Sequence, residues 1–325
     1  MDIQTEQLLG TIEVLLEERL ICRLPCNETS EWKPFVWDSD EKGELNTISL
    51  LKIEGWIKPT DIEIAIQNWQ DIEQSGVPTP YDDYAEDRFD DDDYQDRAAP
   101  EFVNRKVIYQ QLADYITANL KNLQVYQLSS DSVYSCFAIV GEIEEDNWIC
   151  ITSTVPQETP NFEDILVVED KDESVFGILH NESKSTIVSQ IKKILSSLTP
   201  VKIYGFYDGA YEHTYQHQIL YQVASTEEQV FEKALTLSKF LDINKFKTFY
   251  PDPEEYIFTD YAGREEGAEW YSQYQRLNEF LKNNFTQLMV YKFNFWKYTH
   301  VFVIGQSSGN DWVGLRLKSE FDYNP

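Results

Sequence analysis

The sequence contains few of the residues on which most enzyme sites and disulfide-bonded folds depend. Among 325 residues there are four cysteines and four histidines. Four cysteines are too few for a disulfide framework in a chain of this length. The pair Cys22 and Cys26 has no second ligand pair, which argues against zinc. His213 and His217 fall on a predicted strand, where four residues separate side chains by about 13 Å, so we expect both to be surface polar residues rather than metal ligands. We therefore predict free thiols, no metal site, no cofactor and no enzyme activity.

Long apolar segments and a basic leader are also missing. No run of about 18 apolar residues is present, so we predict no membrane span. The first residues, MDIQTEQLLGTIEVLLEERL, have acidic flanks and helical spacing in place of a basic region followed by an apolar one. This pattern argues against a signal peptide and favours a cytoplasmic protein.

Positive charge is scarce, and its scarcity is uneven along the chain. The sequence has 27 Lys and Arg against 57 Asp and Glu, a formal net charge of −30. Residues 1–165 hold 35 acidic and 11 basic side chains, a net of −24, and the remainder has a net of −6. A field of this sign repels nucleic acid and anionic membranes and steers a basic protein partner toward the first half. The alternative is that acidity only keeps the protein soluble.

A sequence repeat links the two halves of the chain. Residues 112–154 resemble residues 277–319, and a repeat of this length indicates gene duplication rather than a solenoid. A fainter match aligns residues 34–37 with 200–203. The paired positions are Leu112 and Leu277, Asn119 and Asn284, Val125 and Val290, Tyr126 and Tyr291, Val140 and Ile304, Gly141 and Gly305, and Trp148 and Trp312.

Hydrophobic periodicity predicts the same order of elements in both copies. An amphipathic helix is followed by two strands, a second helix with a threonine cap, an acidic loop, a long helix and three strands. The predicted domains are residues 1–160 and 184–325, joined by a linker or hairpin at 161–183. The predicted ranges are 5–21, 34–38, 46–54, 60–73, 102–120, 123–128, 134–141 and 147–154 in the first copy, and 184–198, 200–206, 215–224, 226–241, 267–284, 288–293, 299–305 and 311–318 in the second.

The segments NLKNLQVYQL and FAIVGEIEEDNWICITSTVPQET resemble the nuclease A inhibitor family of cyanobacteria, and SEWKPFVWD resembles an upstream segment of that family. The resemblance covers essentially the whole first half. It is weaker in the second, through MVYKF, VFVIGQ and DWVGL. It implies an α+β protein made of two tandem copies of a three-layer α/β/α sandwich with a largely antiparallel sheet. It also implies a protein partner, a Mg²⁺-dependent, sugar-non-specific nuclease.

The family resemblance also implies which residues contact the nuclease. Glu28 and Glu31 would form the acidic contact region, and Glu158 with Thr159 the terminal segment. Carboxylates suit this role because a nuclease cleft is basic and holds a hard divalent cation. Thr159, however, is joined to Pro160 and carries no free carboxylate. Inhibition would then rely on the acidic surface of the first copy.

The most strongly acidic segment is residues 81–98, YDDYAEDRFDDDDYQDRA. Nine carboxylates, among them Asp90, Asp91, Asp92 and Asp93, stand between aromatic residues and would mimic a run of phosphates flanked by stacking groups. The alternative is a solvated, partly disordered loop, because a block of like charges repels itself.

One short string resembles a hydrolase motif. Residues 305–309, GQSSG, match G-x-S-x-G, but this motif requires a strand-to-helix elbow, whereas here it fills a predicted turn between two strands. We therefore predict a non-enzymatic binding protein of the nuclease-inhibitor type. The alternative is a scaffold or assembly factor that kept the fold and lost inhibition.

Overall fold

The computed structural model describes residues 1–17, 20–22, 30–75, 100–130, 134–156, 166–169, 185–207, 211–249, 263–285 and 287–320. These residues form helices and antiparallel strands, which confirms the predicted α+β class. The chain divides into two compact units. Unit 1 consists of Met1–Ser49, Glu158–Gly177 and Asp242–Pro325, and unit 2 consists of Leu50–Gln157 and Ile178–Leu241.

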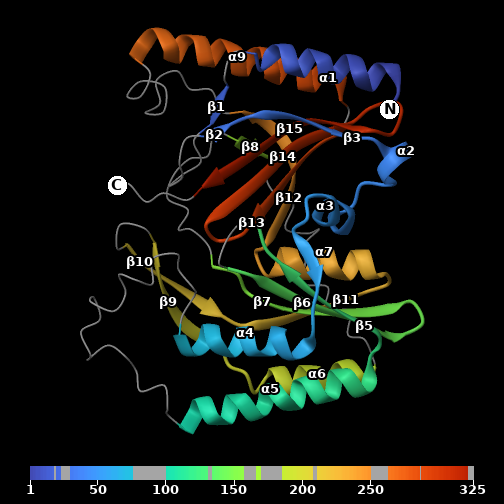
Figure 1. Ribbon diagram of the computed structural model, residues 1–325, viewed down its shortest axis with the longest axis vertical. Helices are drawn as coiled ribbons and strands as arrows, with labels where there is room; N and C mark the ends of the chain where they lie inside the picture. Colours follow the sequence, from blue (N-terminus) through green and yellow to red (C-terminus); the bar gives the residue numbers. More distant parts are fainter. Residues whose placement is uncertain are drawn as a thin grey trace. The chain divides into compact units, whose positions relative to one another are not determined.

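The six-stranded sheet of unit 1 has the order β3-β15-β14-β13-β12-β8. Helices α1 and α9 lie side by side over one face of it (Figure 1). Asp2 caps α1 by accepting a hydrogen bond from the backbone N–H of Thr5 at 2.8 Å. The elements that contribute to this unit are α1 (Ile3–Leu15), β1 (Ile21–Cys22), β2 (Ser30–Glu31), β3 (Lys33–Trp37), α2 (Ser39–Lys42), the start of α3 (Thr47–Ile53), β8 (Leu166–Val168), β12 (Leu241–Phe249), α9 (Gly263–Asn284), β13 (Leu288–Asn294), β14 (Tyr298–Gln306) and β15 (Trp312–Glu320).

Unit 2 has three layers around the five-stranded sheet β11-β7-β6-β5-β4. Helices α4, α5 and α6 share one apolar core with the sheet, and α7 covers the opposite face (Figure 1). Tyr126 of the sheet meets Phe231 of α7 edge to face at 5.7 Å. The elements are β4 (Ile57–Pro59), α4 (Ile62–Ser75), α5 (Pro100–Asn119), β5 (Lys121–Leu128), β6 (Cys136–Glu144), β7 (Asn147–Ser153), α6 (Thr186–Leu195), β9 (Val201–Tyr207), β10 (Tyr211–His217), β11 (Ile219–Ala224) and α7 (Glu227–Leu237).

The long helix and three strands recur in both units with the same register. Val125 faces Ile139 in unit 2 and Val290 faces Val303 in unit 1, as the sequence repeat aligns them. Gly141 and Gly305 also share an environment. A Cβ atom at Gly141 would lie 2.9 Å from Leu120, and one at Gly305 would lie closer still to Phe285. Any side chain larger than that of glycine would therefore collide, at both positions, with the residue that follows the helix.

Strand pairing divides the chain differently from the predicted boundaries at 1–160 and 184–325. Strand β3 pairs with β15, and β11 pairs with β7, so each sheet takes an edge strand from the other half of the sequence. The predicted alignment of residues 34–37 with 200–203 is wrong, because β11 occupies in unit 2 the place that β3 occupies in unit 1.

Two local predictions are also corrected. Residues 46–54 were expected to be a strand, but α3 forms there because the Asn46 side chain accepts a hydrogen bond from the Ser49 N–H at 2.8 Å and so initiates a helix. The linker contains a strand, β8, but β8 pairs with β12 rather than with a second linker strand among the described residues.

Helices α3 and α7 end in the same tight turn. The N–H of Trp56 donates to Leu51 O and that of Phe240 donates to Leu235 O, which is the hydrogen bond of a Schellman motif. The residue before each donor has a left-handed backbone, with φ of 74° at Gly55 and 71° at Lys239. Glycine suits this conformation, whereas a residue with a Cβ is strained in it.

We expect Lys239→Gly to raise the free energy of unfolding by about 1 kcal/mol, because it removes the left-handed strain of an exposed residue. The measurement is urea unfolding, where the midpoint should rise while the slope stays constant. The matched control is Gly55→Ala, which introduces the same strain in the equivalent turn and should lower the midpoint. A Lys239→Gly protein no more stable than the parent would contradict the strain argument.

Candidate functional site

Most of the residues predicted to bind a partner lie outside the described residues. These are Glu28, Asp90, Asp91, Asp92, Asp93, Glu158 and Thr159. Glu31 is described: it is half-buried in β2 and pairs with Ile21 of β1. The next residue, Trp32, is buried, and its Nε1–H donates to the Tyr274 hydroxyl at 3.1 Å. Glu31 therefore stands on a backbone that is fixed by the core of unit 1.

The ring of Trp32 belongs to an aromatic cluster in the core of unit 1. It meets Phe249 edge to face at 5.6 Å, and Phe249 in turn contacts Phe246 and Tyr274 at ring distances of 5.0 and 5.1 Å. Phe249 and Tyr274 are fully buried. Aromatic pairs at these separations add stabilisation beyond the area they bury.

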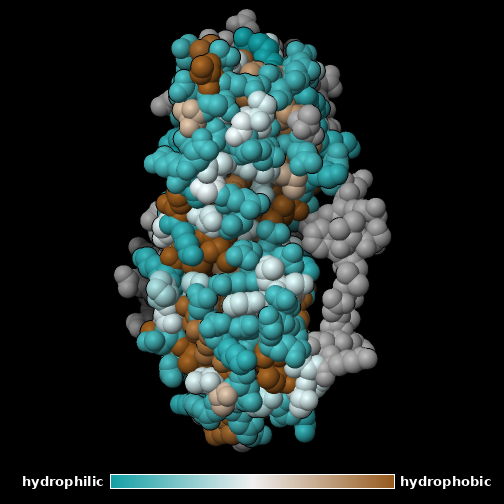
Figure 2. All heavy atoms as spheres, turned by 90° about the vertical axis from the view of Figure 1, so that its right-hand side faces the viewer, coloured by the Kyte–Doolittle hydropathy of each residue, from teal (hydrophilic) through white to brown (hydrophobic). Residues whose placement is uncertain are grey.

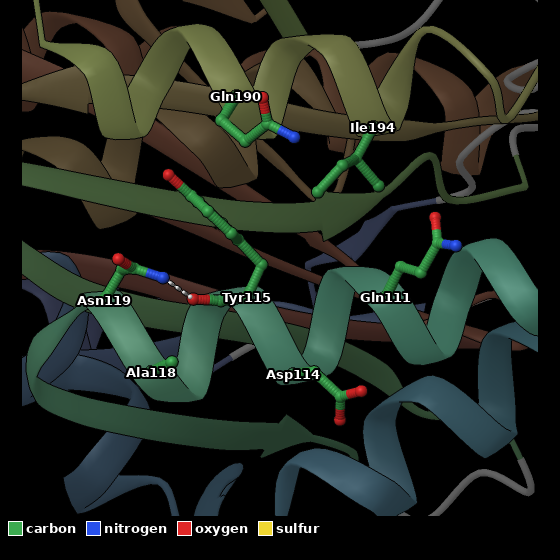
Figure 3. A pocket seen from close by; sticks show the side chains of 7 residues that line it. All are labelled: Gln111, Asp114, Tyr115, Ala118, Asn119, Gln190 and Ile194. Atoms are coloured by element: carbon green, nitrogen blue, oxygen red, sulfur yellow. Dashed lines mark hydrogen bonds between the residues drawn. The ribbon is translucent and has the colours of Figure 1, made fainter.

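An open groove runs between α5 and α6 of unit 2 (Figure 3). Its volume is about 430 Å³, and Tyr115 of α5 projects into it toward Gln190 and Ile194 of α6. Asn119 is fixed at one end by a hydrogen bond to the Tyr115 carbonyl oxygen at 2.8 Å. The groove is open to solvent, whereas a small-molecule site buries most of its ligand. It is therefore an open surface groove rather than an enclosed site.

A buried polar cluster is formed by Glu73 of α4, Arg105 and Tyr109 of α5, and His217 of β10. Arg105 Nε donates to Glu73 Oε2 at 2.8 Å, and the Tyr109 hydroxyl donates to Glu73 Oε1 at 2.7 Å. His217 Nδ1 lies 3.4 Å from the same oxygen. The side chains of Glu73 and His217 are 3% and 0% exposed and that of Arg105 is 12% exposed, so Glu73 and His217 cannot contact a partner directly.

The electrostatics of this buried cluster follow from its contacts. Burial alone would raise the pKa of Glu73, but the hydrogen bonds and positive charge of Arg105, with His217 Nδ1 3.4 Å away, outweigh it, and the pKa is lowered. Burial and the neighbouring Glu73 carboxylate raise the pKa of Tyr109, so this phenol stays neutral. Glu73 is therefore a buried carboxylate held ionised by its partners.

Sequence reasoning missed the buried cluster. His217 was taken as a surface residue because it lies in a polar strand, HTYQHQ, and Glu73 has no distinctive motif. One feature of the sequence could have indicated burial of Glu73: it follows Trp69 by four residues and so lies on the buried face of α4. Contacts between residues this far apart in the chain cannot be read from local spacing.

Residues 207–319 match the family model described as nuclease A inhibitor-like protein. This segment is similar to the nuclease A inhibitor-like family. A comparison of the chain with curated proteins gave no match. The match confirms the family that the sequence resembles, for one copy. It falls in the second half, where the resemblance is fainter, and not in the first half, where we expected it to be strongest.

The inhibitor-like segment runs through both units. Its α7 belongs to unit 2, whereas β12 to β15 belong to unit 1. It contains the string at 305–309, which forms the predicted turn: the Ser307 N–H donates to Asp311 O at 2.7 Å, and the Ser307 hydroxyl lies 3.0 Å from that of Thr5. Strand β15 follows the turn, so the elbow of a hydrolase nucleophile is absent here.

Three further features of the described residues bear on the sequence predictions. No group of three or more His, Cys, Asp or Glu side chains within them is placed to hold a metal ion. In the same part of the chain, no helix combines the length and apolar character needed to cross a bilayer. Cys22, Cys136 and Cys150 are buried, and the last two are free thiols.

Proposed function

We propose that this protein is a nuclease-inhibitor-like binding protein whose acidic surface engages the basic cleft of a Mg²⁺-dependent, sugar-non-specific nuclease. The observation that carries the proposal is the family match of residues 207–319. The net charge of −30 supports it, because a cleft that binds polyphosphate attracts a dense field of carboxylates. The proposed contact residues are Glu28, Glu31, Asp90, Asp91, Asp92, Asp93, Glu158 and Thr159.

The charge is shared by both compact units. The segments of unit 1 hold 30 acidic and 14 basic residues, a net of −16, and those of unit 2 hold 27 acidic and 13 basic residues, a net of −14. The imbalance between the two sequence halves therefore does not single out one acidic unit. On the face drawn in Figure 2, hydrophilic residues dominate and hydrophobic ones form separate patches. This surface favours an electrostatic partner over an apolar one.

The second candidate is a scaffold or assembly factor that kept the fold and lost inhibition. The observation that favours it is Thr159, which is followed by Pro160 and so carries no free carboxylate to meet the nuclease cation. In this case the protein binds another partner and leaves nuclease activity unchanged.

The deciding experiment titrates a sugar-non-specific nuclease with the full chain in a plasmid-digestion assay. We expect stoichiometric inhibition at low salt that weakens as salt rises, because exposed charges are screened. Full activity at a large excess of folded protein and low salt would leave the scaffold as the better explanation. The full chain is required because cutting it at residue 165 would interrupt both units.

A single substitution tests where the nuclease binds. We expect Glu31→Gln to weaken inhibition about fivefold to tenfold, on the order of 1 kcal/mol, because it removes one carboxylate that faces the cation-holding cleft. The control is Glu63→Gln on the exposed side of α4, which removes the same charge elsewhere and should change inhibition less than twofold. Equal effects of both variants would show that only the total charge matters and that Glu31 is not a contact residue.

A further inference from the structure

Each sheet is completed at one edge by a strand from the opposite half of the sequence. In unit 1, β3 pairs with β15, and Trp37 lies opposite Trp312. In unit 2, β11 pairs with β7, and Ala224 lies opposite Trp148. Trp148 and Trp312 are equivalent positions of the sequence repeat. The two edge strands therefore occupy the same register in the two sheets, although each comes from the other repeat.

The helix that precedes each edge strand follows it into the same unit. Helix α1 packs against α9, and α6 packs against α5 in the equivalent place (Figure 1). Leu8 and Ile12 of α1 share a core with Leu277 of α9, and Val188 and Ile191 of α6 share one with Leu112 of α5. Leu112 and Leu277 are again equivalent positions of the repeat. A helix and a strand are thus exchanged together.

Polar contacts between residues from opposite halves of the chain hold both arrangements in place. In unit 2, Arg105 Nη1 donates to the Thr199 carbonyl oxygen at 3.0 Å, and His217 stands against Glu73 in the buried cluster. In unit 1, the N–H of Ser39 donates to Asp311 Oδ1 at 2.8 Å. The Glu73–His217 contact is buried, whereas the other two are exposed or half-buried. A buried polar group is costly to leave unpaired, so the contact in unit 2 favours one pairing of segments.

The chain changes units beside the same turn in both repeats. It leaves unit 1 within α3, and it leaves unit 2 at Leu241, just after α7. Both helices end in Schellman turns, at Gly55 and Lys239. Each turn leads directly into a strand that lies beside the three closing strands of its own repeat: β4 pairs with β5, and β12 lies beside β13. The crossing is therefore equivalent in the two repeats.

We infer that the two repeats have exchanged their N-terminal parts, so that the outer edges of β7 and β15 are interfaces for the helix and strand of the other repeat. An unpaired edge with exposed N–H and C=O groups is a template for another strand, and exchange of identical elements between similar domains satisfies it at little cost. The interface fits one kind of partner, the N-terminal helix and strand of a homologous repeat. This inference does not depend on what the protein inhibits.

Engineered disulfides in the full chain test the inference. Lys33 of β3 and Arg316 of β15 are exposed cross-strand partners, and such partners have Cα atoms about 4.5–5.5 Å apart, within the range of a disulfide. If the repeats were instead closed on themselves, position 33 would face Thr152, the equivalent of Arg316 in β7. The two variants are Lys33→Cys/Arg316→Cys and Lys33→Cys/Thr152→Cys, each with a protease site inserted between residues 170 and 184.

After mild oxidation and cleavage, non-reducing gels distinguish the two arrangements. The exchanged arrangement predicts that the 33–316 variant stays at full mass, whereas the 33–152 variant separates into two pieces. A 33–316 variant that separates, while a Tyr298→Cys/Glu320→Cys variant within the β14–β15 hairpin forms its internal bridge, would overturn the inference. Circular dichroism that matches the parent shows that each variant is folded before oxidation.

A reciprocal variant checks unit 2 independently. Gln222 of β11 lies opposite the native Cys150 of β7, so Gln222→Cys alone is expected to form a bridge to Cys150. If the repeats were closed on themselves, position 222 would face Gly314, and no bridge to Cys150 would form. Peptide mapping identifies the bridged cysteine. Absence of this bridge in the folded, oxidised protein would overturn the exchange in unit 2.

Discussion

Replacement of Glu73 by alanine is expected to lower the free energy of unfolding by about 3–5 kcal/mol, because it leaves buried positive charge without its carboxylate. Glu73 accepts hydrogen bonds from Arg105 and Tyr109 and faces His217, and its side chain is 3% exposed. After the substitution, Arg105 keeps only its bond to the Thr199 carbonyl oxygen among the contacts described above. Urea unfolding followed by tryptophan fluorescence measures the loss.

The control removes both charges together. Glu73→Leu/Arg105→Met replaces the ion pair by apolar side chains of similar size, and it should be much less destabilising than Glu73→Ala, since no charge is left unpaired. A double variant as unstable as Glu73→Ala would contradict the argument from unpaired charge and point to packing alone.

The pH dependence gives a second check on Glu73. Its pKa is lowered in the folded protein, so its contribution to stability is present above the unfolded pKa of about 4.3 and is lost as the pH falls through the lower, folded value. The stability difference between the parent and Glu73→Gln should therefore be constant near neutral pH and shrink in acid. A difference that grows in acid would contradict the lowered pKa.

Local patterns in the sequence predicted the closing strands of each copy well. The three strands that close each copy alternate or run apolar between polar turns, and they were found within a few residues of the expected ranges: residues 134–141 were predicted, and β6 spans Cys136–Glu144. The turn at 305–309 was likewise expected between strands. These elements are specified by residues close together in the chain, so that side-chain periodicity and turn chemistry suffice.

The partners of the edge strands could not be predicted in the same way. The repeat gives β7 and β15 similar edges, so the local sequence pattern does not show which of the two strands pairs with β3. The choice is made by contacts between distant residues, such as Trp32 with Tyr274 and Glu73 with His217. The candidate site was limited for a different reason: among the predicted contact residues, the described part of the chain includes only Glu31.

The aromatic core of unit 1 depends on Phe249, and Phe249→Ala is expected to cost about 3–5 kcal/mol. Its ring is fully buried and contacts Trp32, Phe246 and Tyr274, so truncation removes three aromatic contacts and leaves a cavity. The backbone hydrogen bond from the Phe249 N–H to Asn278 Oδ1 does not involve the side chain and should persist. Thermal or urea unfolding reports the change.

The position of Phe249 makes this loss informative about the exchange of segments. Phe249 and Tyr274 belong to the second half of the chain, whereas Trp32 belongs to the first, so the cavity opens between segments that are distant in sequence. Phe249→Leu keeps much of the buried volume and should cost less than about 1.5 kcal/mol. In a double-mutant cycle, Phe249→Ala and Trp32→Phe should show a coupling of at least about 0.5 kcal/mol, as contacting residues do. Strict additivity of the two variants would mean that β12 does not pack against Trp32. It would then contradict the conclusion that unit 1 is built from both halves of the chain.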